Sequence, residues 1–123
     1  MWASAHTNFK EIKIMSITSK VRQSVVLTGD GQMQKLIAGS AANIGSANIL
    51  SVFAQSTAAD AEVKLYNEAD SSKTAGKLIF HGKFGANDNA VHEFKIPAAG
   101  IYASDGIYAD VTNVDFLYII GTF

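Results

Sequence analysis

The sequence predicts an all-β fold, a single antiparallel β-sandwich of about eight short strands with a jelly-roll-like arrangement. Several short segments alternate apolar and polar residues with the period of two that a pleated strand requires. Clusters of Gly, Asn, Asp and Ser separate these segments at short intervals, as in sandwiches and small barrels. No segment shows a convincing helical period, since Gly and Ser interrupt the alanine-rich patches. These observations favour the sandwich over a small barrel and over any α/β architecture.

The first half of the chain is expected to contain four strands. Residues 16–28 are rich in β-branched side chains and end at Gly29-Asp30-Gly31, whose glycines accept the positive φ of a tight hairpin turn. A returning strand is therefore expected over about residues 32–38, followed by a polar loop with the sequence GSAANIGSAN. Residues 49–55 form a mostly buried strand, and residues 62–67 alternate, with Val63 and Leu65 on one face.

The second half is expected to begin with an exposed loop, because EADSSKTAG contains turn formers and charges and no apolar residue except alanine. Strands follow over residues 76–84 and 91–96, joined by the turn GANDNA and expected to pair. Pro97 ends the second of them because proline has no N–H to donate.

The C-terminal stretch, residues 101–123, is interpreted as the closing hairpin of the domain. Residues 107–112 alternate, whereas residues 116–120 are apolar without a break. A strand there sends Phe116, Tyr118 and Ile120 to one face and Leu117 and Ile119 to the other, and a sandwich core covers only one set. The other set forms an apolar patch, so all five residues are candidate interface residues, and self-association, as a trimer, is expected around this strand.

Composition and length indicate one domain without covalent staples. The chain has 123 residues, no cysteine and a formal net charge of −1, with ten Lys and Arg interspersed among eleven Asp and Glu. The lack of cysteine excludes thiol chemistry. The interspersed charges form no basic patch, so nucleic acid is not expected as a partner. No apolar run is long enough to span a membrane. Residues 1–14 fit the pattern poorly and are expected to be an N-terminal arm or a non-native extension before Met15, with the β-sandwich domain over residues 15–123.

No motif indicates catalysis, a cofactor or a metal site. His6, His81 and His92 lack metal-ligand spacing, although His81 and His92 are expected on paired strands. Each Asp in the clusters around Asp30, Asp88 and Asp105 stands alone as a carboxylate, which favours a turn over a calcium loop. Nucleophile elbows and phosphate-binding loops are absent from the sequence, so a non-enzymatic protein is expected.

A longer pattern resembles small virion structural proteins of tailed phages, especially phages of marine bacteria. It runs from ILSVFAQSTAADAEVKLYNEAD through GKLIFHGKF to HEFKIPAAGIYASDGIYADVTNVDFLYIIG and covers roughly residues 49–121. The resemblance implies a β-sandwich located on the virion and assembled in the host cytoplasm. It also implies a capsid decoration or cement protein that binds and stabilises the assembled head, with the major capsid protein or another virion protein as partner.

Two alternatives stay open. A head-fibre or tail component agrees with the same resemblance. A carbohydrate-binding module would use exposed tyrosines as a glycan platform, for which Tyr66, Tyr102 and Tyr108 are the candidates.

Overall fold

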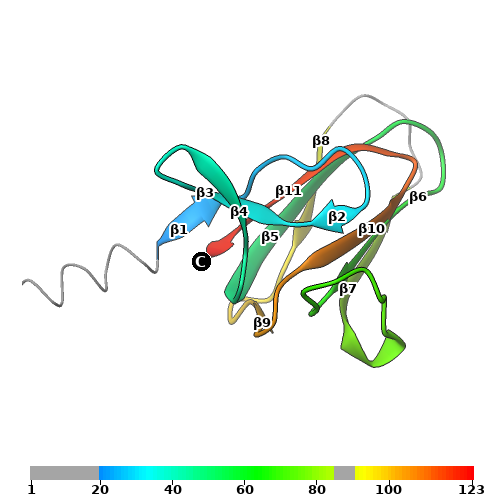
Figure 1. Ribbon diagram of the computed structural model, residues 1–123. Coiled ribbons are helices and arrows are strands. Elements are labelled where there is room, and N and C mark those ends of the chain that lie inside the picture. Colours follow the sequence, from blue (N-terminus) through cyan, green and yellow to red (C-terminus); the bar gives the residue numbers. More distant parts are fainter. Residues whose placement is uncertain (1–19, 85–90) are drawn as a thin grey trace, which may run out of the picture.

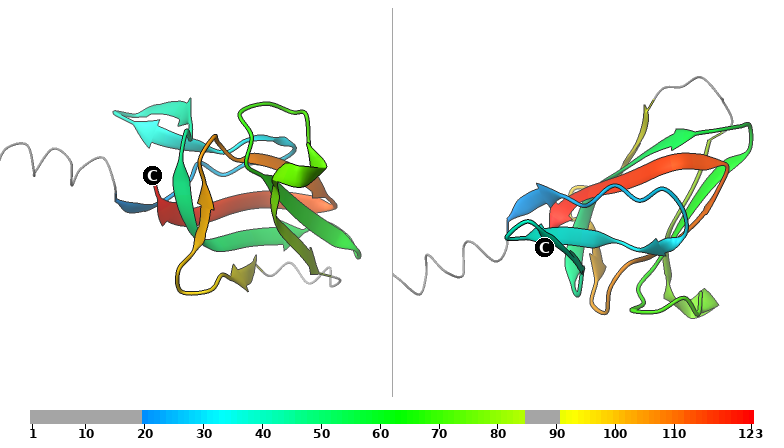
Figure 2. Two further views of the ribbon diagram at one scale, coloured as in Figure 1. Left: turned by 90° about the horizontal axis from the view of Figure 1, so that it is seen from below. Right: turned by 45° about the horizontal axis from the view of Figure 1, so that its top comes forward.

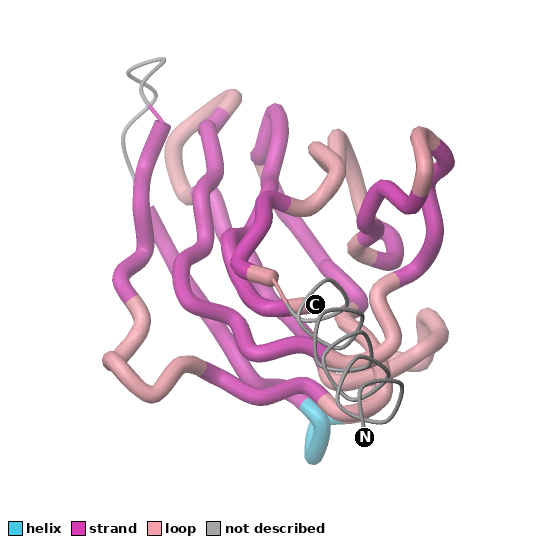
Figure 3. The backbone as a smooth tube through the Cα atoms, turned by 90° about the vertical axis from the view of Figure 1, so that its left-hand side faces the viewer, coloured by secondary structure: helices cyan, strands magenta, loops and turns pink. Residues whose placement is uncertain are grey.

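The computed structural model describes residues 20–84 and 91–123, which form two antiparallel sheets that face each other (Figures 1 and 3). The predicted all-β antiparallel sandwich is therefore confirmed. The described residues contain eleven strands rather than about eight, because several strands are only two to four residues long.

Sheet A is built around the two longest strands. Its order is β1 (Val21–Gln23), β11 (Val114–Thr122), β5 (Ala47–Ser56) and β8 (Val91–Lys95). Strand β9 (Ile101–Ala103) pairs with the first residues of β5, and β8 pairs with the later ones. In Figure 1, β11 (red) and β5 (green) run side by side through the molecule. The last described strand in the sequence thus lies between two earlier ones.

Sheet B and a small ribbon complete the architecture. Sheet B has the order β2 (Gly31–Gln32), β10 (Tyr108–Thr112), β6 (Ala61–Tyr66) and β7 (Leu78–Phe84), and a single 3-10 turn, η1 (Ala75–Lys77), precedes β7. Strands β3 (Gln34–Ile37) and β4 (Ser40–Asn43) form a separate two-stranded ribbon, seen beside the sheets in Figure 2. Ala38 and Gly39 close this ribbon with positive φ angles of 51° and 84°.

The core lies between the two sheets and takes the inward residues of each strand. Burying one large aliphatic side chain of this kind stabilises the fold by about 1.5–3 kcal/mol. The fully buried large side chains include Met33, Ile44, Ile49, Val52, Val63, Leu65, Ile107, Leu117 and Ile119. Val63 and Leu65 were predicted to share a face, and both are completely buried.

Aromatic side chains fill the core between β7 and β8. Phe94 on β8 packs edge-on against Phe80 and Phe84 of β7, with ring centroids 5.5 and 5.4 Å apart. Gly82 lies beneath these rings. A Cβ atom there would lie 2.8 Å from Phe94 and 2.9 Å from Phe80, so the rings pack where only glycine leaves room.

The predicted hairpins are wrong, because the expected partners lie in different sheets. Strands β10 and β11 do not pair: β10 pairs with β2 and β6, and β11 with β1 and β5. A single residue joins them, Asn113, with a φ of 55°, and its side-chain Nδ2 donates to the carbonyl oxygen of Ala59 (3.1 Å). The chain therefore turns a corner from one sheet to the other at Asn113.

The same correction applies elsewhere. Strands β7 and β8 belong to opposite sheets rather than to one hairpin. The segment before Gly29 also joins β11, through β1 and a bridge between Leu27 and Leu117. It keeps one backbone hydrogen bond to the expected partner, from the Val25 N–H to the carbonyl oxygen of Gln34 (2.8 Å), but forms no strand pair with residues 32–38. The expected polar loop at residues 39–48 contains β4, which pairs with β3.

The segment expected to be an exposed loop, residues 68–76, is anchored by a buried carboxylate. Glu68 is 3% exposed, and its side chain accepts hydrogen bonds from the backbone N–H groups of Lys73 (2.9 Å) and Thr74 (3.0 Å). A buried charge is tolerated when such donors satisfy it. The sequence did not reveal this role, because a glutamate beside turn formers looks like solvated charge.

Of the described aspartates beside glycine, Asp30 accepts a backbone hydrogen bond through its carboxylate, whereas Asp105 is held through its own backbone N–H. The Val111 N–H of β10 donates to Oδ1 of Asp30 (2.8 Å), so this carboxylate caps a distant strand rather than its own turn. Asp105 is held by Asn67, whose Oδ1 accepts from the Asp105 N–H (2.8 Å). Asp88 lies outside the described residues.

Candidate functional site

Strand β11 presents the two residue sets predicted from its unbroken apolar run. Leu117 and Ile119 point into the core and are 1% and 0% exposed. Phe116, Tyr118 and Ile120 lie on the outer face of sheet A and are half-buried. The two core residues therefore leave the candidate interface, and the three outer residues remain.

The outer residues of β11 belong to a larger aromatic group. Phe53 of β5 lies directly opposite Tyr118, and their rings stack with centroids 4.9 Å apart and planes 12° apart. Phe116 and Tyr118, two residues apart on β11, are nearly parallel, with centroids 6.3 Å apart. We call Phe53, Phe116, Tyr118 and Ile120 the aromatic stripe. Sequence reasoning missed Phe53, because the segment ILSVFAQ was interpreted as mostly buried.

Polar and charged residues of β8 border the aromatic stripe. Glu93 pairs with Phe53 and Lys95 pairs with Ser51 in the sheet register, so one acid and one base lie in successive outward rows. Oγ of Ser51 lies 3.2 Å from Oε2 of Glu93, and both charged side chains are exposed. An apolar centre with a polar rim is the usual anatomy of a protein interface.

The outer face of sheet B has the opposite character. Glu62 at its centre lies 2.9 Å from Nε2 of His81 and 3.6 Å from the ammonium groups of both Lys64 and Lys83. The hydrogen bond from His81 is the main cause that lowers the pKa of Glu62 below 4.5, and the two lysines lower it further. This face is a network of solvated ion pairs.

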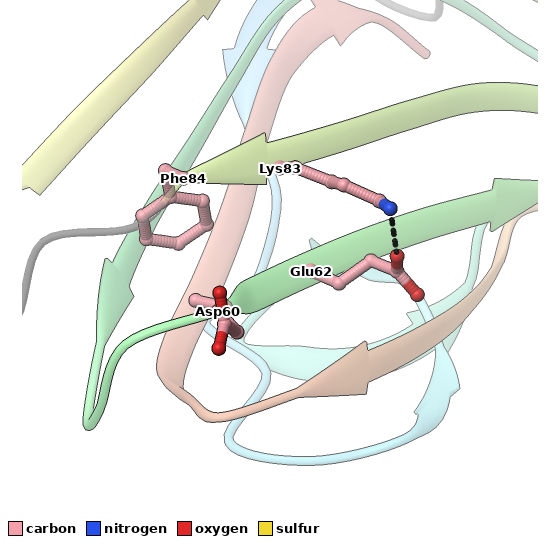
Figure 4. A pocket seen from close by; sticks show the side chains of 5 residues that line it. Asp60, Glu62, Lys83 and Phe84 are labelled. Atoms are coloured by element: carbon pink, nitrogen blue, oxygen red, sulfur yellow. Dashed lines mark ion pairs between the residues drawn. The ribbon is translucent and has the colours of Figure 1, made fainter.

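A hollow lies beside this network. It has a volume of about 360 Å³ and is lined by Asp60, Ala61, Glu62, Lys83 and Phe84. Figure 4 shows the side chains of Glu62 and Lys83 directed toward each other across neighbouring strands, with Asp60 just before the start of β6 and Phe84 at the end of β7. Of the two acids in the lining, Glu62 is engaged in ion pairs with Lys83 and Lys64.

His81 and His92 lie on different sheets and have different partners. His81 contacts Glu62 on β6, whereas the His92 ring packs against Phe84 with centroids 4.8 Å apart. His6 lies outside the described residues. Within residues 20–84 and 91–123, no group of three or more His, Cys, Asp or Glu side chains is arranged to hold a metal ion.

The proposed tyrosine platform is wrong for two of its three members. Tyr66 and Tyr108 are only 7% and 9% exposed, and they are paired partners across β6 and β10. Tyr102 of β9 is 65% exposed. The alternating pattern did not predict that Tyr66 and Tyr108 are buried. Both occupy positions that alternate with core residues, and such positions are expected to face solvent.

The described part of the chain contains no helix with the length and hydropathy needed to cross a lipid bilayer. No family model, no curated protein and no solved structure matches this chain. Exposed large apolar side chains, among them Val21, Leu36, Ile37 and Tyr102, lie outside the aromatic stripe. The stripe itself is half-buried, and its distinguishing feature is a stacked aromatic group with no charge among its members.

Proposed function

We propose that this chain is a non-enzymatic structural protein that associates with copies of itself through the aromatic stripe of sheet A. The observation that carries the proposal is the contrast between the two outer sheet faces. Sheet B presents charges neutralised within the face, around Glu62. Sheet A presents three aromatic rings and an isoleucine with no charge among them.

A second copy of the chain is the occupant that best fits this face. The rim beside Phe53 carries both a carboxylate, Glu93, and an ammonium group, Lys95, in adjacent rows. A surface whose rim carries both a positive and a negative charge can pair with a copy of itself. The acid of one copy then approaches the base of the next, and like charges do not meet. Such contacts close into a cyclic oligomer, and a trimer is the one we propose.

The setting we propose is the phage particle, as a decoration or cement protein that binds the major capsid protein of the assembled head. The support for this setting is the sequence pattern over residues 49–121, which resembles small virion structural proteins. The fold agrees with this setting, since a β-sandwich with one apolar outer face suits a small subunit on the surface of a particle. A head-fibre or tail component has the same support and differs in its copy number on the particle.

The oligomeric state of the purified chain tests the self-association. The parent is expected to sediment as a trimer. Tyr118→Ser is expected to sediment as a folded monomer, because the substitution removes the central aromatic ring of the stripe. Tyr102→Ser is the matched control, since it makes the same change at an exposed tyrosine away from the stripe. A parent that stays monomeric at high concentration, or a Tyr118→Ser variant that stays trimeric, would contradict the proposal.

A core truncation on the same strand separates loss of association from loss of folding. Leu117→Ala is expected to lower the free energy of unfolding by about 2–5 kcal/mol, because Leu117 is 1% exposed and its removal leaves a cavity. Tyr118→Ser is expected to retain the circular dichroism spectrum of the parent. If Tyr118→Ser unfolds the chain as Leu117→Ala does, the ring belongs to the fold and not to an interface.

A further inference from the structure

A second hollow lies at the opposite end of sheet A from Phe116. It has a volume of about 410 Å³. Its lining includes Lys35, Ser46, Asn48, Tyr102, Thr122 and Phe123. These residues come from four segments of the chain that the fold brings together. Nothing in the self-association proposed above uses them.

Three of the lining residues form one row across the outer face of sheet A. Tyr102 of β9 pairs with Asn48 of β5, and Asn48 pairs with Thr122 of β11. The row therefore places a phenol ring, a carboxamide and a hydroxyl group side by side. Thr122 is four residues beyond Tyr118 and two beyond Ile120, so it lies about 13 Å along the strand from the central ring of the aromatic stripe and about 7 Å from the nearest stripe residue.

Asn48 is held in place by a turn. Its Nδ2 donates to the carbonyl oxygen of Ala99 (3.1 Å), and the Gly100 N–H donates to the carbonyl oxygen of Pro97 (2.7 Å). Gly100 has a φ of 79°, and a Cβ atom there would lie 2.6 Å from the Asn48 amide. The glycine thus lets the turn pack on Asn48, whose amide oxygen keeps its capacity to accept a hydrogen bond.

The polar groups around the row are free to bind. Among the described residues, the side chains of Lys35, Ser46 and Thr122 make no hydrogen bond or ion pair. Tyr102 is 65% exposed, and no close ring pair in the described part of the chain includes it. Its ring faces are therefore available to a ligand, in contrast to Tyr118, which Phe53 covers on one face.

This combination selects a class of ligand. The lining supplies donors and acceptors from an ammonium, an amide and hydroxyl groups, together with one exposed ring, while Phe123 is only 5% exposed. An apolar peptide anchor needs a hydrophobic cavity, which is absent here because Tyr102 is the single exposed apolar surface in the lining. A sugar presents a C–H face for an aromatic ring and a rim of hydroxyl groups for polar partners.

We infer that this hollow is a binding site for a neutral carbohydrate, with Tyr102 stacking on a sugar ring and Asn48, Ser46, Thr122 and Lys35 binding its hydroxyl groups. The inference does not rest on the proposed self-association. The sequence suggested a glycan platform of three tyrosines, and the inferred site keeps one of them, Tyr102, in a polar hollow.

Nuclear magnetic resonance titration of the isotopically labelled full chain tests the site, with maltotriose, cellotriose and chitotriose as probes. At least one trisaccharide is expected to shift the backbone amide signals of Ser46, Asn48 and Tyr102, with a dissociation constant in the millimolar range. Tyr102→Ala is expected to weaken that binding by about tenfold or more, because the stacking ring is lost. Thr122→Val is expected to weaken it while leaving the fold intact.

Other results would overturn the inference. These are the absence of shifts with all three sugars, shifts confined to Phe53 and Tyr118, or a Tyr102→Ala variant that binds as the parent does. Dissociation of the oligomer by Tyr102→Ser would assign Tyr102 to the subunit interface instead. Tyr118→Ser is the matched control and is expected to bind the sugar unchanged, so the carbohydrate site and the self-association fail independently.

Discussion

At the scale of single residues, the tightest constraint is the glycine beneath the aromatic rings of β7 and β8. Gly82 has no positive φ, so its role is not conformational. The constraint is space, because a Cβ atom would lie closer to the Phe80 and Phe94 rings than real Cβ contacts allow. Core packing of this kind relaxes only by shifting the rings away from their preferred rotamers.

Gly82→Ala is therefore expected to lower the free energy of unfolding by about 1–3 kcal/mol, measured by urea denaturation. Gly29→Ala is the control, since nothing lies within 4 Å of its added methyl group. Its effect is expected to stay within about 0.5 kcal/mol or to stabilise slightly. Equal losses in the two variants would show that the rings do not press on position 82.

The Glu62 carboxyl gives a pH-dependent prediction. Its pKa is lowered below 4.5 by the hydrogen bond from His81 and by the lysines around it. A lowered pKa in the folded state contributes stability above the ordinary carboxyl pKa, and this contribution is lost as the pH falls through the folded-state value. In His81→Ala, the Glu62 pKa is expected to rise toward 4.5.

Carbon-detected titration of the Glu62 side chain measures this change directly. Lys35 lines the other hollow and is not among the groups that lower the Glu62 pKa, so Lys35→Ala serves as a control that leaves this pKa where it was. Urea denaturation curves of the parent and of His81→Ala are expected to converge as the pH falls toward the folded-state value. A parent Glu62 that titrates at 4.5 or above would contradict the role of His81.

At the scale of elements, the corner between β10 and β11 decides how the two sheets are connected. One residue, Asn113, carries the chain from sheet B to sheet A with a φ of 55°. The Thr57 N–H donates to its carbonyl oxygen (2.9 Å), and its side chain binds Ala59, so the corner is tied to the loop after β5. Asparagine tolerates this left-handed conformation better than most residues.

Asn113→Val is expected to cost more than the about 1–2 kcal/mol of an ordinary residue in the left-handed region, because a β-branched side chain fits it poorly. Asn113→Gly is expected to be milder, since it keeps the conformation and loses only the hydrogen bond to Ala59. Thermal unfolding compares the two variants. A glycine variant that is less stable than the valine variant would place the importance of Asn113 in its side chain rather than its φ.

Sequence reasoning predicted the elements better than their pairing. The alternation of β6 with Val63 and Leu65 inward was correct, because one face of that strand is buried and the other carries Glu62 and Lys64. The corner at Asn113 was not predictable, since asparagine and aspartate serve hairpin turns and sheet-to-sheet corners equally. The face of β11 that points outward was also undetermined, because both faces are apolar and the neighbouring strands decide which is covered.

At the scale of the whole molecule, the fold places its two candidate surfaces on one side. The aromatic stripe and the Tyr102 hollow both lie on the outer face of sheet A, whereas sheet B carries the ion-pair network around Glu62. A subunit with one binding side and one charged side suits attachment to a larger surface.

If the protein is a cement protein, particles that lack it are expected to release their DNA at a lower temperature than complete particles. A subunit that binds only the assembled shell shifts the equilibrium toward that shell by mass action. Dye-accessible DNA measured during a temperature ramp reports the release. Adding the purified parent is expected to restore heat resistance, and Tyr118→Ser to restore less. Equal resistance with and without the protein would favour a fibre or tail component.

The position of β11 in the sheet has a consequence for how the protein is made. Every other described strand precedes β11 in the chain, yet β1 and β5 both take it as their partner in sheet A. During translation these strands leave the ribosome before their shared neighbour is synthesised, so the backbone edges that pair with β11 have no partner. Sheet A is therefore completed only after the last strand emerges, so a ribosome stalled before Val114 displays a nascent chain that chaperones can bind and proteases can cut.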